Sequence, residues 1–245
     1  MFVEFTVSQI VATALVFIWT GFVRAGLGFG GAALGLPLLL FINSDPLYWL
    51  PMIGVHLLFF SALTLWNRLD DIDWRYLFLA CTFIVPAAIA GIFGLLNFPT
   101  AWMLMFIYSV TLSYGFLWLI NAQIRSHNPW LDRALLISGG YVAGTTLSGA
   151  PLIVAVFARN VSAARLRNTL FVLWFFLVSV KMSAFVMFAV PMHFLQALVL
   201  IPVASIGHVY GQRVHQRIVQ QDHLYKRFIG GGLLLISLLG LIHFI

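Results

Sequence analysis

Long stretches without a formal charge constrain the fold of this chain more than any other feature of its sequence. No Asp, Glu, Lys or Arg occurs between Arg75 and Arg125, and Lys181 is the only one between Asn168 and Gln212. About 20 apolar residues cross the hydrocarbon core of a bilayer as a helix, so each stretch can hold two crossings. Only 8% of the 245 residues are charged, against about 25% in soluble domains. The sequence therefore predicts an all-α polytopic membrane protein and excludes a soluble enzyme, a nucleic-acid module and a disordered chain.

Hydropathy predicts six uninterrupted spans and two apolar segments that are broken by glycine. The spans are about 50–67, 75–96, 100–122, 169–189, 194–211 and 227–245. The broken segments are 7–42, where four glycines follow Arg24 within seven residues, and 134–158, where glycines recur between Gly139 and Pro151. Because glycine weakens a helix interior, both helices are expected to break at these points.

The basic residues predict how the broken segments cross the membrane. Eleven of the thirteen lie in four loops, near 68–75, 123–133, 159–167 and 212–227. These loops share one side only if each broken segment crosses an even number of times, as a re-entrant hairpin or a helix pair. Since Lys and Arg concentrate in cytoplasmic loops, we predict cytoplasmic basic loops, both termini outside, and a multi-pass protein of the bacterial inner membrane.

This topology makes the second half of the chain an inverted copy of the first. A single membrane domain, 1–245, would contain repeats of about 7–122 and 134–245, each a hairpin followed by three spans. The sequences agree: Gly21–Ala25 aligns with Gly140–Gly144, 119 residues later, and Val85–Gly91 with Ile201–Gly207, 116 residues later. Inverted repeats with broken helices are typical of secondary transporters. The alternative is chance, because Gly and Pro are common in membrane helices.

The glycine breaks are the predicted anion-binding site, because the N–H groups and the positive dipole end of a helix start attract anions. Arg24 and Lys181 lie outside the loops, and no acid lies in a predicted span, so a bound anion is their natural counter-ion. The alternatives are glycines that only allow close packing, Arg24 at a cytoplasmic hairpin tip, and a neutral Lys181 bound to carbonyls. The predicted substrate-binding residues are Arg24, Gly28, Gly30, Gly31, Thr145, Thr146, Ser148, Gly149 and Lys181.

Two histidines within the predicted spans, His56 and His208, are weaker candidates for proton coupling, since histidine titrates near neutrality. A hydrogen-bonded packing role is the alternative for each. The one cysteine, Cys81, excludes an internal disulfide and a cysteine-based metal cluster. Nucleotide-binding, zinc-protease and serine-hydrolase motifs do not occur, so the sequence predicts no metal, no cofactor and no catalytic site.

At these residues the chain resembles the sulfite exporter TauE/SafE family. The first-half signature is similar to Gly21–Ala32 with Pro37–Leu40, and the second to Gly149–Pro151 with Leu166–Thr169. The resemblance covers essentially the whole chain, including its length and span pattern. It implies export or uptake of small sulfur-containing or carboxylate anions, such as sulfite, a sulfonate or sulfoacetate.

The chain departs from the family pattern at the breaks themselves. Ala32 and Ala150 stand where glycines are expected, Thr145–Leu147 is not glycine-rich, and Arg24 is unexpected. These residues change the donors and the volume of the predicted site, so the particular anion stays open.

Together these features predict a secondary transporter of a small anion that works by alternating access, with proton coupling, direction and homo-oligomerisation left open. Its partners would be the anion and the lipid bilayer, without nucleic acid. Two other classes stay as alternatives. A passive anion channel shares the positive interior, and an intramembrane enzyme or assembly factor would use His56 or His208 with a hydroxyl.

Overall fold

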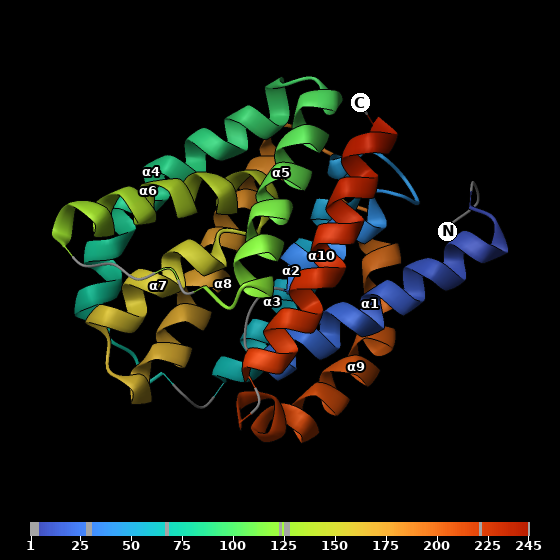
Figure 1. Ribbon diagram of the computed structural model, residues 1–245. Helices are drawn as coiled ribbons and strands as arrows, with labels where there is room; N and C mark the ends of the chain where they lie inside the picture. The colour runs from blue at the N-terminus through green and yellow to red at the C-terminus, as the bar shows by residue number, and fades with distance from the viewer. Residues whose placement is uncertain are drawn as a thin grey trace. The chain divides into compact units, whose positions relative to one another are not determined.

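The computed structural model describes residues 5–27, 31–66, 69–122, 124, 128–220 and 222–244. In these ranges it contains ten helices and no strand (Figure 1). The helices are α1 Val7–Leu27, α2 Gly31–Leu39, α3 Pro46–Leu65, α4 Trp74–Asn97, α5 Thr100–Leu119, α6 Pro129–Thr146, α7 Ala150–Asn160, α8 Ala163–Met187, α9 Phe194–Gln220 and α10 Asp222–Phe244.

The helices confirm the prediction of an all-α polytopic membrane protein. Each of the six uninterrupted spans is a helix, α3, α4, α5, α8, α9 or α10, and each broken segment is a pair, α1 with α2 and α6 with α7. Within the described ranges, seven helices are long and apolar enough to cross a membrane, and the seventh is the Val7–Gly26 part of α1.

The polar segment 212–227 differs from its prediction as a loop. It is helical up to Gln220 and again from Asp222, so α9 continues two turns beyond the predicted span. The reason is local propensity: Gln and Arg are good helix formers, and a helix continues past the apolar region where its residues favour it. His215 lies in this added part of α9.

The chain divides into two compact units that are not contiguous in sequence. The first comprises Met1–Met52, Phe98–Gln123 and His193–Ile245, and the second comprises Ile53–Asn97 and Ile124–Met192. The first therefore contains α1, α2, α5, α9 and α10, the second contains α4, α6, α7 and α8, and α3 contributes to both.

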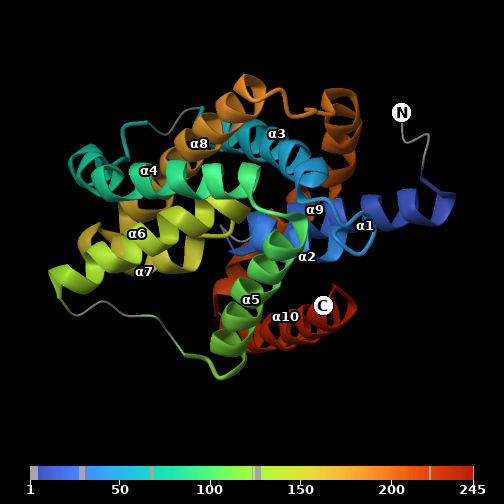
Figure 2. The ribbon, with the colours of Figure 1, turned by 90° about the horizontal axis from the view of Figure 1, so that it is seen from above.

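In the first unit α1 and α9 run side by side and in the same direction (Figure 1 and Figure 2). A Cβ atom on Gly207 would meet the carbonyl oxygen of Ile18, and one on Gly211 would meet that of Phe22, one turn further along both helices. The two backbones are thus in direct contact, which small residues permit in membrane helices.

In the second unit α4 and α6 pack in the same way, again in parallel (Figure 2). A Cβ atom on Gly140 would meet the Ile84 carbonyl oxygen, and one on Gly144 would meet that of Ala88. The motifs that align in the sequence therefore make corresponding contacts: the Gly21 motif packs on the Gly207 motif, and the Gly140 motif on the Gly91 motif. The inverted orientation of the two repeats stays a prediction.

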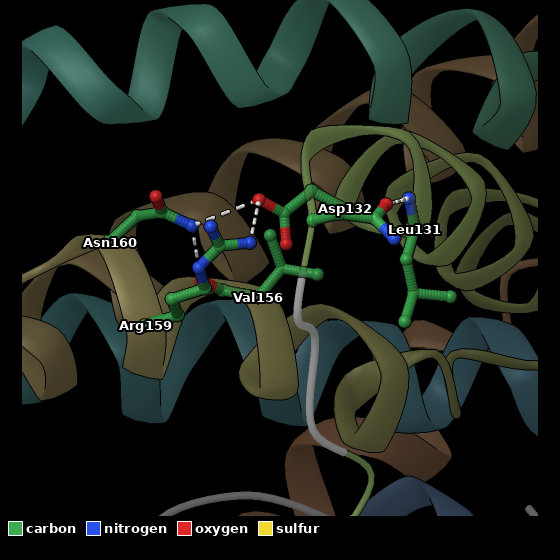
Figure 3. Close-up of polar contacts among 6 residues, drawn as sticks. Leu131, Asp132, Val156, Arg159 and Asn160 are labelled. Atoms are coloured by element: carbon green, nitrogen blue, oxygen red, sulfur yellow. Dashed lines mark hydrogen bonds and ion pairs between the residues drawn. The ribbon is translucent and has the colours of Figure 1, made fainter.

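Each glycine-broken segment folds back on itself. In the first, the Gln9 side-chain amide donates to the Ile42 carbonyl at 3.4 Å, which joins the two ends of segment 7–42. In the second, Arg159 forms an ion pair with Asp132 at 3.1 Å (Figure 3). Both segments are therefore pairs of helices that fold back on each other. The even number of membrane crossings stays a prediction.

The arms of the hairpins are unequal. At 1.5 Å per residue, the nine-residue α2 and the eleven-residue α7 are about 14 and 17 Å long. The hydrocarbon core of a bilayer is about 30 Å thick. Each short arm is therefore about half as long as that core is thick, and each break joins a long helix to a half-length one.

Candidate functional site

The first break lies at the end of α1, where α2 begins on its surface. Arg24, in the last turn of α1, is buried with 7% of its surface exposed. A Cβ atom on Gly31 would lie 2.9 Å from the Thr20 carbonyl oxygen and 3.2 Å from the Arg24 Cβ, so the start of α2 sits directly against Arg24. The predicted site residues Gly28 and Gly30 lie outside the described residues.

The first break also involves a residue that the sequence analysis missed, His215. The ring nitrogen Nδ1 of His215 donates to the Gly26 carbonyl at 2.6 Å. Gly26 is in the last turn of α1, where carbonyls have no partner within the helix, and a basic side chain there also complements the helix dipole. The missed signal is spacing: His215 follows Gly207 and Gly211 at four-residue intervals and so shares the face of α9 that touches α1.

The second break is made by Leu147, which ends α6 in the left-handed conformation, with φ 61° and ψ 16°. Helices often end on such a residue, but it is usually glycine, because a side chain in this region costs about 1–2 kcal/mol. The next helix starts at once: Gly149 is the N-cap of α7. A Cβ atom on Gly149 would meet the Gly139 carbonyl oxygen, so α7 begins directly on α6.

Lys181 is the charged residue of the second break. It lies in the second half of α8 and is 1% exposed. Its Nζ donates to the Thr145 carbonyl at 3.0 Å and lies 5.6 Å from the centre of the Phe185 ring. Thr145 is in the last turn of α6, so the ammonium group satisfies a carbonyl at the negative end of that helix. An ammonium has three donors, and this contact uses one.

The hydroxyl residues of the second break are buried and hydrogen-bonded to the backbone. The Ser148 hydroxyl donates to the Thr146 carbonyl, and the Ser148 amide to the Thr146 hydroxyl, each at 3.2 Å. The hydroxyls of Thr145 and Thr146 donate to carbonyls one turn earlier in α6. Lys181 and the Ser148 hydroxyl thus donate to the carbonyls of Thr145 and Thr146 at the end of α6, where a buried polar group without a partner would be costly.

The predicted site residues thus form two groups, one in each unit. The structure brings Arg24 and Gly31 together at the first break, and Thr145, Thr146, Ser148 and Gly149 with Lys181 at the second. That the two groups serve one anion stays a prediction. Of the weaker candidates, His56 is buried in α3, and His208 is buried in α9 with its Nε2 3.0 Å from the amide nitrogen of Gln212.

Within the ranges that the structure describes, no group of three His, Cys, Asp or Glu side chains could hold a metal ion. Several buried polar groups instead lie at the two breaks: Arg24 at the end of α1, and Thr145, Thr146, Ser148 and Lys181 at the end of α6. A polytopic helical protein with two such broken-helix hairpins has the architecture of a transporter.

Comparison with protein families agrees with this class. The profile of the family described as Sulfite exporter TauE/SafE matches residues 13–239, nearly the whole chain. The chain belongs to the TauE/SafE family, a family of membrane transporters of sulfite and related anions. No curated protein and no solved structure matches it.

Proposed function

We propose that this protein is a secondary transporter of one small sulfur-containing or carboxylate anion, which it moves across the bacterial inner membrane by alternating access. The observation that carries the proposal is Lys181, a basic side chain with 1% of its surface exposed, at the point where α6 ends and α7 begins. A cation at this depth is costly and marks a substrate pathway or an ion partner. In the proposal, the donors of Lys181 that do not bind Thr145 bind the anion.

In this proposal the anion binds at the broken ends of the hairpins. Amide groups at the start of α7, from Gly149 onward, provide donors for an anionic oxygen, and Ser148 and Thr145 set the size of the site. Arg24 and Gly31 contribute in the corresponding way at the first break. The chain's two halves would exchange access as inverted repeats, with His56 and His208 as weaker candidates for coupling to protons.

The first experiment tests binding on the purified protein. Sulfite, a sulfonate and a carboxylate are screened for a shift in the thermal unfolding temperature of wild type, Lys181→Met and Arg165→Met. Arg165 is exposed at the start of the same helix, so its variant removes a charge away from the break. We expect one anion to stabilise wild type and Arg165→Met but not Lys181→Met. Equal stabilisation of all three would remove Lys181 from the site.

The second experiment tests transport in proteoliposomes. A secondary transporter coupled to protons accumulates the anion against its gradient when a proton gradient is imposed, whereas a channel only lets the anion equilibrate. We expect accumulation by wild type and loss of flux in Lys181→Met. Flux that never exceeds equilibrium would favour the channel alternative.

The third experiment tests the proposed topology. Single cysteines are placed at Leu47 and Pro129 in a background that lacks Cys81, and each is labelled from one side of the membrane with an impermeant reagent. We expect opposite sides, position 129 being cytoplasmic. Labelling from the same side would overturn the even number of crossings and the inverted repeat.

A further inference from the structure

A groove of about 750 Å³ lies between α1 and α9 on the first unit, apart from the residues proposed to bind the anion. Its lining is almost wholly apolar, with Leu15, Ile18 and Phe22 from α1 and Ile206 from α9. Both helices are among those long and apolar enough to cross a membrane. In a bilayer such a groove is open to lipid and must be filled by apolar material, since water gains no partners there.

The floor of the groove follows from the glycine contact described above. Because Gly207 has no side chain, α9 touches α1 at Ile18, and larger side chains stand on either side of the contact line. Trp19 and Phe22 form one wall, with their rings stacked at 5.9 Å, and Tyr210 faces Phe22 at 6.3 Å. The bottom of the groove is thus backbone, and its sides are lined by aromatic side chains.

The length of the groove fits one leaflet of a bilayer. It follows α9 from Pro202 to Arg213, which at 1.5 Å per residue is about 17 Å. Half of a hydrocarbon core of about 30 Å is about 15 Å. An extended acyl chain that starts at one end of the groove would therefore end near the middle of the membrane.

One end of the groove carries the groove's charge. Arg213 is its single ionised lining residue, and a guanidinium group binds phosphate oxygens through paired hydrogen bonds. Tyr210, one turn before Arg213, is 62% exposed, and tyrosine favours the level of the lipid headgroups. An apolar groove that ends at an arginine complements a lipid acyl chain attached to a phosphate group.

The same charge argues against a second copy of this chain as the occupant. The seven acids are Glu4, Asp45, Asp70, Asp71, Asp73, Asp132 and Asp222, and none lies in a helix stretch able to span the membrane. A helix of a neighbouring copy could bring a carboxylate to Arg213 only from a residue beyond the end of a span, whereas a phospholipid carries its phosphate at the end of its acyl chains, where the groove has Arg213.

We propose that the groove between α1 and α9 binds one phospholipid with an anionic headgroup, its acyl chain along Ile18 and Gly207 and its phosphate on Arg213. The corresponding helix pair of the second unit provides a comparison. At the positions 116 residues earlier, α4 has Asn97 in place of Arg213 and Gly94 in place of Tyr210. On α6, Tyr141 stands in place of Phe22 but Ser138 in place of Trp19. That pair lacks the cation and most of the aromatic wall, so the selectivity for anionic lipid belongs to the α1–α9 groove.

The test measures lipid binding to the full-length protein in detergent by native mass spectrometry. Phosphatidylglycerol and phosphatidylcholine with identical chains are titrated onto wild type, Arg213→Gln, Ser205→Trp and Arg75→Gln. Ser205 lines the groove and bonds its hydroxyl to its own helix, so a tryptophan there fills the groove without touching the α1–α9 contact. Arg75 is exposed in the first turn of α4 and is the matched control.

We expect wild type and Arg75→Gln to prefer phosphatidylglycerol. Arg213→Gln should lose that preference through a roughly tenfold weaker affinity, which is about 1.4 kcal/mol, and Ser205→Trp should bind neither lipid at this site. Unchanged selectivity in Arg213→Gln would overturn the proposal. So would a dimer that Ser205→Trp dissociates, because the groove would then belong to a second copy.

A second measurement keeps the test independent of the folding of Ser205→Trp. Phosphatidylglycerol with brominated chains quenches nearby tryptophan fluorescence, and Trp19 is in the groove wall. We expect quenching in wild type that falls in Trp19→Phe and in Arg213→Gln. Equal quenching in wild type and Trp19→Phe would place the lipid elsewhere and overturn the proposal.

Discussion

The two broken hairpins, α1–α2 and α6–α7, have the same plan but different basic groups at their breaks. Gly26 and Thr145 correspond in the alignment of the two halves, 119 residues apart. The carbonyl of Gly26 accepts from His215 on α9, and the carbonyl of Thr145 accepts from Lys181 on α8. A buried helix end needs a donor for its last carbonyls, and each of the two units supplies one from a different helix.

The two breaks share a requirement but not a residue. At each break the last carbonyls of the long helix need a hydrogen-bond donor, but the donor is a lysine at one break and a histidine at the other. Lysine and histidine differ in burial here, since Lys181 is 1% exposed and His215 is part-buried. The chemistry that distinguishes the two halves therefore lies in side chains that a duplication does not preserve.

The largest expected effect tests the feature that the halves share, the glycine contact. Gly144→Ala would place a Cβ against the Ala88 carbonyl, and Gly207→Ala against the Ile18 carbonyl. Because backbone faces backbone, neither side can yield locally, and each variant should lose about 3 kcal/mol or more of unfolding free energy in detergent.

The control is Gly232→Ala in α10, where a Cβ meets nothing within 4 Å. It should gain about 0.5–1 kcal/mol. Equal effects at Gly232 and Gly207 would contradict the backbone contact.

A smaller effect should distinguish Lys181 from His215, the two side chains that donate to the carbonyl end of a broken helix. In Lys181→Met the Thr145 carbonyl loses a donor that water cannot replace, which costs about 1–3 kcal/mol. Hydrogen exchange of the Ser148 and Gly149 amides should therefore accelerate by roughly 10-fold or more. In His215→Leu the part-buried ring is lost beside the buried Gly26, so water can enter in its place and bind the Gly26 carbonyl, and the acceleration should be several-fold smaller. If His215→Leu accelerates amide exchange at the end of α1 as much as Lys181→Met does at the end of α6, the difference in burial between the two donors does not matter and the comparison is wrong.

The smallest effects belong to the open ends of the hairpins. The Asp132–Arg159 pair has side chains 14% and 38% exposed, so Asp132→Asn should cost at most about 1 kcal/mol, a difference that 1 M salt should reduce. The Gln9–Ile42 hydrogen bond is long, at 3.4 Å, and Gln9→Leu should cost less still, without dependence on salt. Salt-dependent destabilisation by Gln9→Leu would contradict the assigned contact.

Much of the fold could be predicted from the sequence because a bilayer permits few structures. The charge-free stretches and the glycine breaks predict the helices and hairpins, since an apolar chain must satisfy its backbone internally. The ends of helices were less predictable where the chain leaves the apolar region. α9 continues to Gln220 because polar residues with good helix propensity carry no hydropathy signal of a span.

The candidate site was predictable as residues but not as contacts. Lys181 and the hydroxyls near Ser148 could be selected because polar groups are rare in spans. Their partners could not, because Lys181 contacts a main-chain carbonyl and every residue has one. His215 was missed because it lies in a polar stretch, where a histidine carries no signal; only its spacing from Gly207 and Gly211 points to α1.

The caps also fix when each break can be completed during synthesis. Lys181 follows its partner Thr145 by 36 residues, so the second hairpin has its cap as soon as α8 is made. His215 follows Gly26 by 189 residues, and Tyr108, whose hydroxyl donates to the Pro37 carbonyl in α2, follows Pro37 by 71. The hairpin that emerges first from the ribosome is therefore the last to be capped, and it must stay in the membrane incomplete until α9 arrives.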